Sequence, residues 1–254
     1  MLAKISRAYA VMKLTKRYFR PNQVPTDFCV YYIDGTPRTI YGQNALVMLM
    51  GIVLNDSYGL KRFKYLENIV DIGANIGIFS LYAALSFPQA KILAYEPCIL
   101  SRQNLEKNLS QLDNVYIYPY AVGGTTKKVR LNYQDDLSAC YVSQPEESVN
   151  TNSQDCNMIS LDEITETLKS PIGLLKLDCE GFEYEIIQTL SFEKVRYVVG
   201  EFHTCEQGNP ELGIKLLQER GFIIDKWVPF PDGKAGEFWA SNSRNTAAER
   251  AWLR

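Results

Sequence analysis

The segment at residues 70–80, VDIGANIGIFS, restricts the fold of this chain more than any other. Asp71 lies at the end of an apolar run that predicts a strand, Gly73 and Gly77 bracket a tight turn, and an apolar helix pattern follows at once. Glycine lets the backbone approach a ligand closely, and a helix N-terminus offers free amide groups to an anion. The order of strand, glycine loop and helix predicts the first half of a nucleotide-binding βαβ unit.

The second half of that unit follows directly. Residues 91–95 (KILAY) predict a second strand, and Glu96 comes next, nineteen residues past Gly77. An acidic side chain at this position binds the ribose hydroxyls in βαβ units of this kind. The sequence therefore predicts a cofactor that contains a nucleoside.

Beyond residue 66, short apolar runs alternate with amphipathic stretches. This alternation predicts an α/β fold with a mostly parallel sheet and helices on both faces. Strands are predicted at 66–72, 91–95, 115–122, 127–133, 174–177, 197–202, 222–228 and 237–240, and helices at 76–85, 100–112, 161–168, 182–190 and 212–219. The stretch at 134–158 is polar, so we expect it to form a loop or an insertion.

The sequence predicts one domain over residues 43–254, preceded by an N-terminal segment at 1–42. Residues 1–26 of that segment form a basic arm with six basic side chains and no acidic one. Such an arm is either solvated or makes weak peripheral contact with an anionic membrane. The longest apolar run, residues 45–54, is too short to cross a bilayer and predicts a buried helix.

Composition narrows the class of protein further. The 254 residues include 27 basic and 29 acidic side chains, a net charge of −2, which argues against a nucleic-acid partner. The six cysteines are scattered and there is one histidine. We therefore expect reduced thiols, a cytoplasmic protein and no structural zinc site.

The glycine loop is compatible with two kinds of cofactor. A dinucleotide loop has a glycine where this chain has Asn75, since the middle glycine admits the pyrophosphate. Asp71, just before the loop, suits an ammonium group better than a pyrophosphate. A ligand with an adenosine, an amino group and a carboxylate fits best, and S-adenosylmethionine has all three. An NAD(P)-dependent oxidoreductase is the main alternative, although no Tyr-x-x-x-Lys follows the loop. The second alternative is a Rossmann-like binding module that keeps the sheet but has lost catalytic activity.

Charged side chains follow two of the later strands. Lys176, Asp178 and Glu180 alternate along the end of the strand at 174–177, in a position where a buried parallel strand is normally apolar. Glu201 and His203 alternate at the end of the strand at 197–202. Methyl transfer to a hydroxyl needs a base, and the candidates in order are Asp178, Glu180 and His203. No metal is assigned, although these acids with Glu201 and His203 leave a metal-assisted variant open.

Five strings occur in sequence order: VDIGANIGIFS, AYEP, YAVGG, SLDEI and, at residues 174–187, LLKLDCEGFEYEII. Together they resemble the FkbM-type S-adenosylmethionine-dependent methyltransferases. The resemblance implies a Rossmann-like methyltransferase fold with a seven-stranded sheet whose last strand is antiparallel. It also implies O-methylation of a hydroxyl on a sugar or glycan, a polyketide or a related small metabolite.

The resemblance also implies a role for each matching residue. The methionine half of the cofactor would contact Asp71, Gly73, Asn75 and Gly77, the ribose Glu96, and the adenine Ala121 and Val122. Asp178 and Glu180 would face the sulfonium and the acceptor. The match is weakest in the basic arm and at 134–158, so the identity of the acceptor is left open.

Overall fold

A computed structural model describes residues 28–33, 36–42, 44–133, 140–143, 153–191 and 193–253. The basic arm at 1–26 lies outside these residues, and so do both alternatives given for it, a solvated arm and a weak contact with a membrane. In the part of the chain that the structure describes, no helix is long and apolar enough to cross a membrane.

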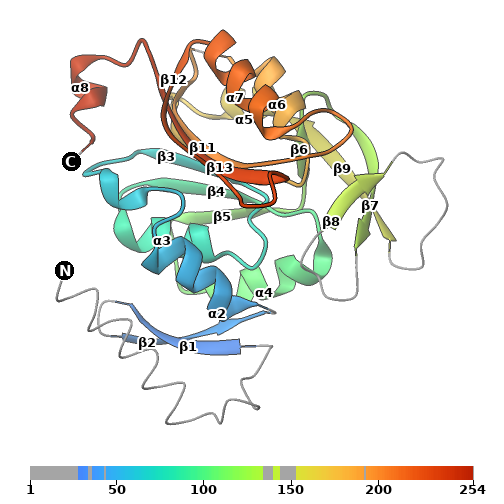
Figure 1. Cartoon of the computed structure of the whole chain (residues 1–254). Coiled ribbons are helices and arrows are strands. Elements are labelled where there is room, and N and C mark those ends of the chain that lie inside the picture. Colours follow the sequence, from blue (N-terminus) through green and yellow to red (C-terminus); the bar gives the residue numbers. More distant parts are fainter. Residues whose placement is uncertain are drawn as a thin grey trace.

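A seven-stranded sheet forms the centre of the molecule (Figure 1). Its order is β12 (Phe222–Pro229), β13 (Ala235–Asn242), β11 (Val195–His203), β10 (Ile172–Leu177), β3 (Asn68–Ile72), β4 (Lys91–Tyr95) and β5 (Val115–Tyr118). The pairs from β11 to β5 are all parallel, whereas β13 runs antiparallel to both β11 and β12. The predicted mostly parallel sheet with an antiparallel last strand is confirmed. Every residue of β3 and β10 is buried, as expected for strands covered on both faces.

Helices cover both faces of this sheet, as predicted (Figure 1). One face carries α3 (Ile78–Ser86) and α4 (Ile99–Leu109), and the other α5 (Leu161–Thr167), α6 (Glu183–Thr189) and α7 (Pro210–Glu219). Local signals fix several of the ends. Asn209 caps α7 by accepting from the backbone N–H of Leu212, Pro210 occupies the first turn, and Gly221 follows the helix with φ +86°.

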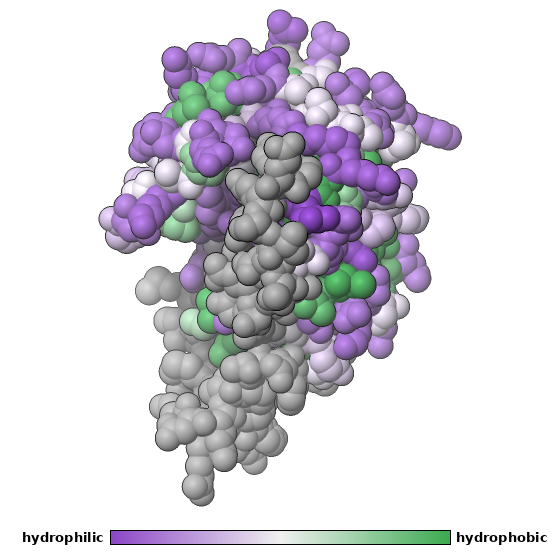
Figure 2. Space-filling model, turned by 90° about the vertical axis from the view of Figure 1, so that its right-hand side faces the viewer, coloured by the Kyte–Doolittle hydropathy of each residue, from purple (hydrophilic) through white to green (hydrophobic). Residues whose placement is uncertain are grey.

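A second, four-stranded sheet lies beside the first. Its order is β6 (Ala121–Gly123), β9 (Ser153–Ser160), β7 (Lys127–Tyr133) and β8 (Cys140–Ser143). The sequence predicted one strand at 115–122 and a loop at 134–158, and both predictions are wrong in part. Pro119, which has no N–H to donate to a sheet, separates β5 from β6, and the polar stretch supplies β8 and most of β9. On the face shown in Figure 2 hydrophilic side chains predominate and hydrophobic ones form small patches.

The chain before β3 adds a hairpin and short helices. The hairpin pairs β1 (Phe28–Ile33) with β2 (Thr36–Tyr41), followed by α2 (Ala45–Met48), the π-helix η1 (Leu49–Leu54) and the 3-10 helix η2 (Leu60–Arg62). The predicted helix at 45–54 is therefore present but only half buried. Leu49 is buried, whereas Val47 and Met50 are 67% and 49% exposed.

The C-terminal helix α8 (Ala247–Arg250) begins with a capping box. Thr246 Oγ1 accepts from the N–H of Glu249, and the Glu249 carboxylate accepts from the N–H of Thr246. Glu249 also pairs with Arg196 of β11, which ties this end of the chain to the sheet.

Candidate active site

A cavity of about 320 Å³ opens at the carboxyl ends of β3, β4, β10 and β11. Open α/β sheets bind their ligands at this edge, and the volume falls in the range of small-molecule sites. Seven of the predicted site residues line the cavity: Gly73, Asn75, Glu96, Ala121, Val122, Asp178 and Glu180. The other three, Asp71, Gly77 and His203, are not part of its lining.

The glycine loop packs tightly against the turn that follows β10. Gly73 has φ +74°, and a Cβ built on it would lie 1.8 Å from the carbonyl oxygen of Asp178. On the other side of β10, a Cβ on Gly200 would lie 1.9 Å from the carbonyl oxygen of Leu177. The end of β10 is therefore held between the backbones of Gly73 and Gly200, neither of which has a side chain.

The remaining loop positions have different roles. Asn75 has φ +49°, a left-handed conformation that asparagine adopts more readily than most residues. Gly77 has φ +87°, and Leu105 and Leu109 of α4 fill the space beside it, 3.2 Å from where a Cβ would lie. Gly77 therefore serves the packing of α3 on α4, outside the cavity.

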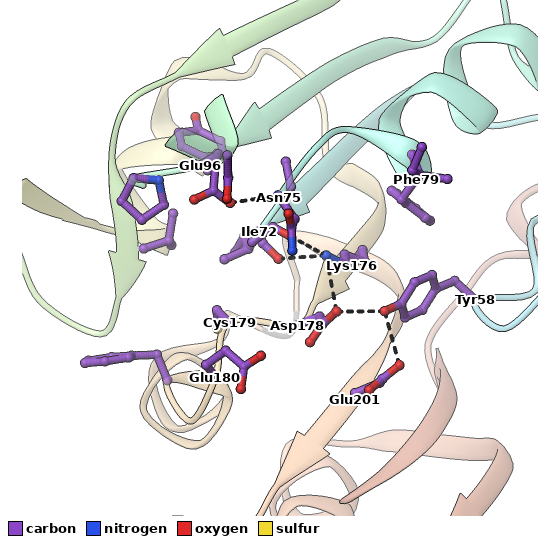
Figure 3. A pocket seen from close by; sticks show the side chains of 18 of the residues that line it. Tyr58, Ile72, Asn75, Phe79, Glu96, Lys176, Asp178, Cys179, Glu180 and Glu201 are labelled. Atoms are coloured by element: carbon purple, nitrogen blue, oxygen red, sulfur yellow. Dashed lines mark hydrogen bonds and ion pairs between the residues drawn. The ribbon is translucent and has the colours of Figure 1, made fainter. Parts of the chain in front are cut away.

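Glu96 holds the loop from the end of β4 (Figure 3). Its two carboxylate oxygens accept from the backbone N–H groups of Asn75 at 2.7 Å and Cys98 at 2.8 Å. Burial raises the pKa of Glu96 to about 7, against the opposing effect of these two hydrogen bonds. The carboxylate is thus fixed in the cavity wall, and its contact with the ribose stays a prediction.

Asp71 lies beneath the cavity. It is fully buried, accepts from Ser80 Oγ at 2.7 Å and pairs with Lys176 Nζ at 3.1 Å. Lys176 also donates to the carbonyl oxygens of Gly73 at 2.6 Å and Ile72 at 3.3 Å. Burial lowers the pKa of Lys176, but Asp71 and Asp178 outweigh that effect and the pKa stays above its usual value. Asp71 therefore reaches the loop through Lys176, and its predicted direct contact with the cofactor stays a prediction.

The Asp178 carboxylate lies at the centre of the acidic wall of the cavity, which Glu180 and Glu201 complete (Figure 3). Its Oδ2 accepts from the Tyr58 hydroxyl at 2.8 Å and lies 3.7 Å from Lys176 Nζ. The same hydroxyl is 3.4 Å from Glu201 Oε1. Burial, followed by repulsion from Asp178, raises the pKa of Glu201 to about 8. The pKa of Glu180 is raised to about 7, mainly by burial.

His203 lies beside Glu201 near the end of β11. Its Nε2 lies 3.8 Å from Glu201 and its Nδ1 3.8 Å from Glu183. Burial lowers the pKa of His203, but the carboxylates of Glu183, Asp178 and Glu180 outweigh that effect and raise the pKa to about 10. A raised pKa favours the protonated imidazole, which does not accept a proton, and the role of His203 as a base stays a prediction. Its geometry suits a charge partner of the carboxylates better than the base predicted from sequence.

Glu183 fixes the turn between β10 and α6. It is fully buried and accepts from the N–H groups of Cys179 at 2.7 Å and Gly181 at 2.8 Å. The anchored turn holds Glu180 at φ +56°, a left-handed conformation that strains a glutamate.

Donor atoms of Asp178, Glu201 and His203 lie within 4.8 Å of one another, while Glu180 is not part of this group. The sequence left a metal-assisted variant open on these residues. His203 lies 3.8 Å from both Glu201 and Glu183, and these contacts are ion pairs when the imidazole is protonated. We assign no metal to the group, and that assignment stays a prediction.

Sequence reasoning missed Tyr58, because it stands outside every motif, in the segment between η1 and η2. A tyrosine just after an apolar helical stretch gives no signal of its own. Only the folded chain brings its hydroxyl to the end of β10, 120 positions later in the sequence.

Comparison with known proteins agrees with this geometry. The sequence model of the methyltransferase FkbM domain matches residues 71–224. Methyltransferase sdnD of Sordaria araneosa is 28% identical over 200 residues, covering 63% of this chain and 77% of that protein. Methyltransferase 1 of Beauveria bassiana is 25% identical over 212 residues, covering 72% and 84%. The fibrillarin pre-rRNA processing protein of Methanococcus jannaschii has a similar structure, with a TM-score of 0.50, 11% identity and coverage of 89% and 87%. At that identity the likeness shows the fold alone.

The fold is that of a Rossmann-like methyltransferase, and the matched region contains the glycine loop together with Glu96, Asp178, Glu180 and Glu201 of the cavity. The chain belongs to the FkbM methyltransferase family. It is a methyltransferase with S-adenosylmethionine as its cofactor. The cavity fits that cofactor, because a fixed carboxylate at Glu96, apolar Ala121 and Val122, and the acidic Asp178 and Glu180 suit a ribose, an adenine and a cationic sulfur.

Proposed function

We propose that this protein transfers the methyl group of S-adenosylmethionine to a hydroxyl oxygen of a small molecule or glycan, with Asp178 as the base. The observation that carries the proposal is the position of Asp178. It lines the same cavity as Glu96 and the glycine loop, and Tyr58 and Lys176 hold its carboxylate there.

The cofactor-binding residues have separate parts in this proposal. Glu96 binds the ribose hydroxyls, Ala121 and Val122 contact the adenine, and the backbone at Gly73 and Asn75 approaches the methionine half. Glu180 and Asp178 supply negative charge near the sulfonium. Asp71 and Gly77 support the loop from outside the cavity, through Lys176 and through α4.

Bound S-adenosylmethionine supplies a methyl group on a cationic sulfur, which is already a good leaving group. The main task of the protein is therefore to align the acceptor oxygen, and orientation alone can lower a barrier by several kcal/mol. The acceptor oxygen bonds to the methyl carbon as the carbon–sulfur bond breaks, and its proton passes to Asp178. The products are a methyl ether and S-adenosylhomocysteine.

The charge of the cavity supports a neutral acceptor. Among the described residues that line the cavity, Lys176 is the one basic side chain, and it already faces Asp71. Outside the lining, His203 faces Glu183, and Lys226 pairs with Glu237 at 3.0 Å. A phosphate or carboxylate on the acceptor would meet the acidic wall and be repelled. Hydroxyl groups of a sugar or glycan, a polyketide or a related metabolite would not. The exclusion of nucleic acid stays a prediction, in line with this wall.

Calorimetric titration of the purified protein tests the cofactor half of the proposal, with S-adenosylhomocysteine, NADH and NADPH as separate ligands. We expect micromolar binding of S-adenosylhomocysteine alone. Binding of a reduced nicotinamide instead would favour the oxidoreductase alternative. Binding of none of the three would favour a module that has lost its chemistry.

The acceptor half of the proposal is tested by following the transfer of a radiolabelled methyl group from S-adenosylmethionine to a panel of hydroxylated sugars, glycans and polyketides. With an acceptor in hand, Asp178→Asn should lower turnover by about 10²–10⁴-fold, the usual contribution of a positioned base, and leave S-adenosylhomocysteine binding intact. The matched control is Asp162→Asn, because Asp162 lies on the surface, 56% exposed and paired with Lys194. Near-normal turnover of folded Asp178→Asn would remove Asp178 as the base. A parallel assay after chelation separates the metal-assisted variant, which requires that activity be lost.

A further inference from the structure

Tyr58 brings a side chain from outside the matched family region, residues 71–224, to the acidic wall. Its side chain is 3% exposed, and its ring packs edge-to-face on Phe79 of α3 with centroids 5.5 Å apart. Trp239 of β13 donates from its indole nitrogen to the carbonyl of Ser57 at 2.6 Å, so the neighbouring backbone is fixed as well. The Tyr58 hydroxyl therefore has a defined position in the cavity (Figure 3).

That hydroxyl has one proton and two carboxylates within reach. It donates to Asp178 Oδ2 at 2.8 Å, and Glu201 Oε1 lies farther away, at 3.4 Å. Burial, together with the negative charge of Asp178 and Glu201, raises the pKa of Tyr58 well above its usual value. Tyr58 thus remains a donor throughout the range in which the carboxylates titrate.

A hydrogen bond to the charged form of a carboxylate stabilises that form. Because the donor is closer to Asp178 than to Glu201, it favours a charge on Asp178. The two carboxylates repel each other, so a charge on Asp178 in turn favours a proton on Glu201. Lys176 acts in the same direction, since its Nζ lies 3.7 Å from Asp178 Oδ2.

Other titratable groups face this pair from each packed element. They are Lys176 on β10 with Asp71 behind it, Cys179, Glu180 and Glu183 in the turn and α6, His203 on β11 beside Glu201, and Glu237 on β13. Of the groups named, Tyr58 alone is an uncharged donor at hydrogen-bond distance from Asp178.

We propose that Tyr58 is a positioning residue for methyl transfer, whose hydroxyl orients the Asp178 carboxylate and keeps it the ionised member of the Asp178–Glu201 pair. The inference rests on the proposed role of Asp178. Tyr58 acts through Asp178 and forms or breaks no bond to the acceptor. The two contacts to Tyr58 and Lys176 both fall on Oδ2, which fixes the side-chain rotamer and turns the other oxygen away from Tyr58.

Carboxyl-¹³C NMR of aspartate-labelled protein tests this directly, because it follows the ionisation of Asp178 without an acceptor. In Tyr58→Phe we expect the Asp178 titration midpoint to rise by about one pH unit, a tenfold change in its ionisation equilibrium, since a hydrogen bond to a charged group is lost. Tyr65→Phe is the matched control. Tyr65 is 44% exposed and donates to Glu67 at 3.0 Å, away from the cavity, so the midpoint should not move. An unchanged midpoint in folded Tyr58→Phe would overturn the proposal.

A reciprocal variant covers the case in which Tyr58→Phe does not fold. In Asp178→Asn, ring-¹³C NMR of labelled tyrosine should show Tyr58 ionising at a lower pH than in the unmodified protein, because a neighbouring negative charge is gone. An unchanged Tyr58 titration would contradict the proposed coupling. Both titrations are read in the free protein, so a failure of S-adenosylhomocysteine binding would refute the proposed function and leave this test intact.

Discussion

Replacing Lys176 by methionine removes a cation that contacts both the glycine loop and the end of β10. Lys176 is 3% exposed and its partner Asp71 is fully buried. In Lys176→Met, Asp71 keeps the hydrogen bond from Ser80 but loses its counter-charge at 3.1 Å. The carbonyl oxygens of Gly73 and Ile72 lose a donor at the same time.

The size of the effect follows from the burial. Removing one partner of a buried ion pair leaves an uncompensated charge and costs about 3–5 kcal/mol of unfolding free energy. For a chain of this size each kcal/mol shifts the melting temperature by roughly 2–4 °C, so we expect a decrease of about 6–20 °C. Urea unfolding followed by circular dichroism gives the free energy, and calorimetry gives the melting temperature.

Two further variants make the test specific. Lys215→Met removes an exposed lysine, 69% accessible, that pairs with Glu219 at 3.6 Å, and should change stability by less than about 0.5 kcal/mol. The double variant Asp71→Asn/Lys176→Met removes both charges, while the amide oxygen introduced at position 71 can still accept from Ser80. It should therefore recover at least about 1 kcal/mol of the single-variant loss. A loss below about 1 kcal/mol in Lys176→Met, or no recovery in the double variant, would refute the assignment of a buried, mutually dependent pair.

Two other predictions concern the cofactor and the C-terminal helix. The pKa of Glu96 is raised to about 7 by burial, and a ribose hydroxyl binds the ionised carboxylate better. Affinity for S-adenosylhomocysteine should therefore increase from pH 6 to pH 8, and calorimetry of Glu96→Gln should show weaker binding without that increase; the same pH dependence in the variant would contradict the assignment. Thr246→Ala removes half of the capping box of α8 and should lower stability by about 1 kcal/mol in urea unfolding, whereas Thr246→Ser should be near neutral.

The parts of the fold that the sequence predicted correctly are those in which chain pattern and burial coincide. β3, β4 and β7 follow directly from apolar or alternating runs, and α7 from its periodicity and the glycine that follows it. The failed prediction of a loop at 134–158 depended on pairing between distant segments. β9 is polar along most of its length and becomes a strand because it pairs with both β6 and β7.

The candidate site shows the same division. Residues at strand ends, such as Asp178 and Glu96, were found because the carboxyl ends of parallel strands must meet at one edge. The position of a residue at a strand end does not reveal how deeply its side chain is buried or which charged groups surround it. The contact of Asp71 with the cofactor and the role of His203 as a base stay predictions, whereas the burial of Asp71 against Lys176 and the position of His203, 3.8 Å from both Glu183 and Glu201, came only from the structure. Tyr58 had no motif to mark it and came only from the tertiary structure.

The two glycines beside the end of β10, Gly73 and Gly200, determine how precisely the proposed base, Asp178, is placed. Because neither Gly73 nor Gly200 can gain even a methyl group without meeting a carbonyl oxygen, the peptide that leads into Asp178 is confined from both sides by backbone, the least deformable part of the protein. Misplacing a reacting group by about 1 Å can cost about a hundredfold in rate. The spacing of the three adjacent strands β3, β10 and β11 therefore limits how far the backbone of Asp178 can move. Cavity side chains that do not touch Asp178 can be replaced without moving the base.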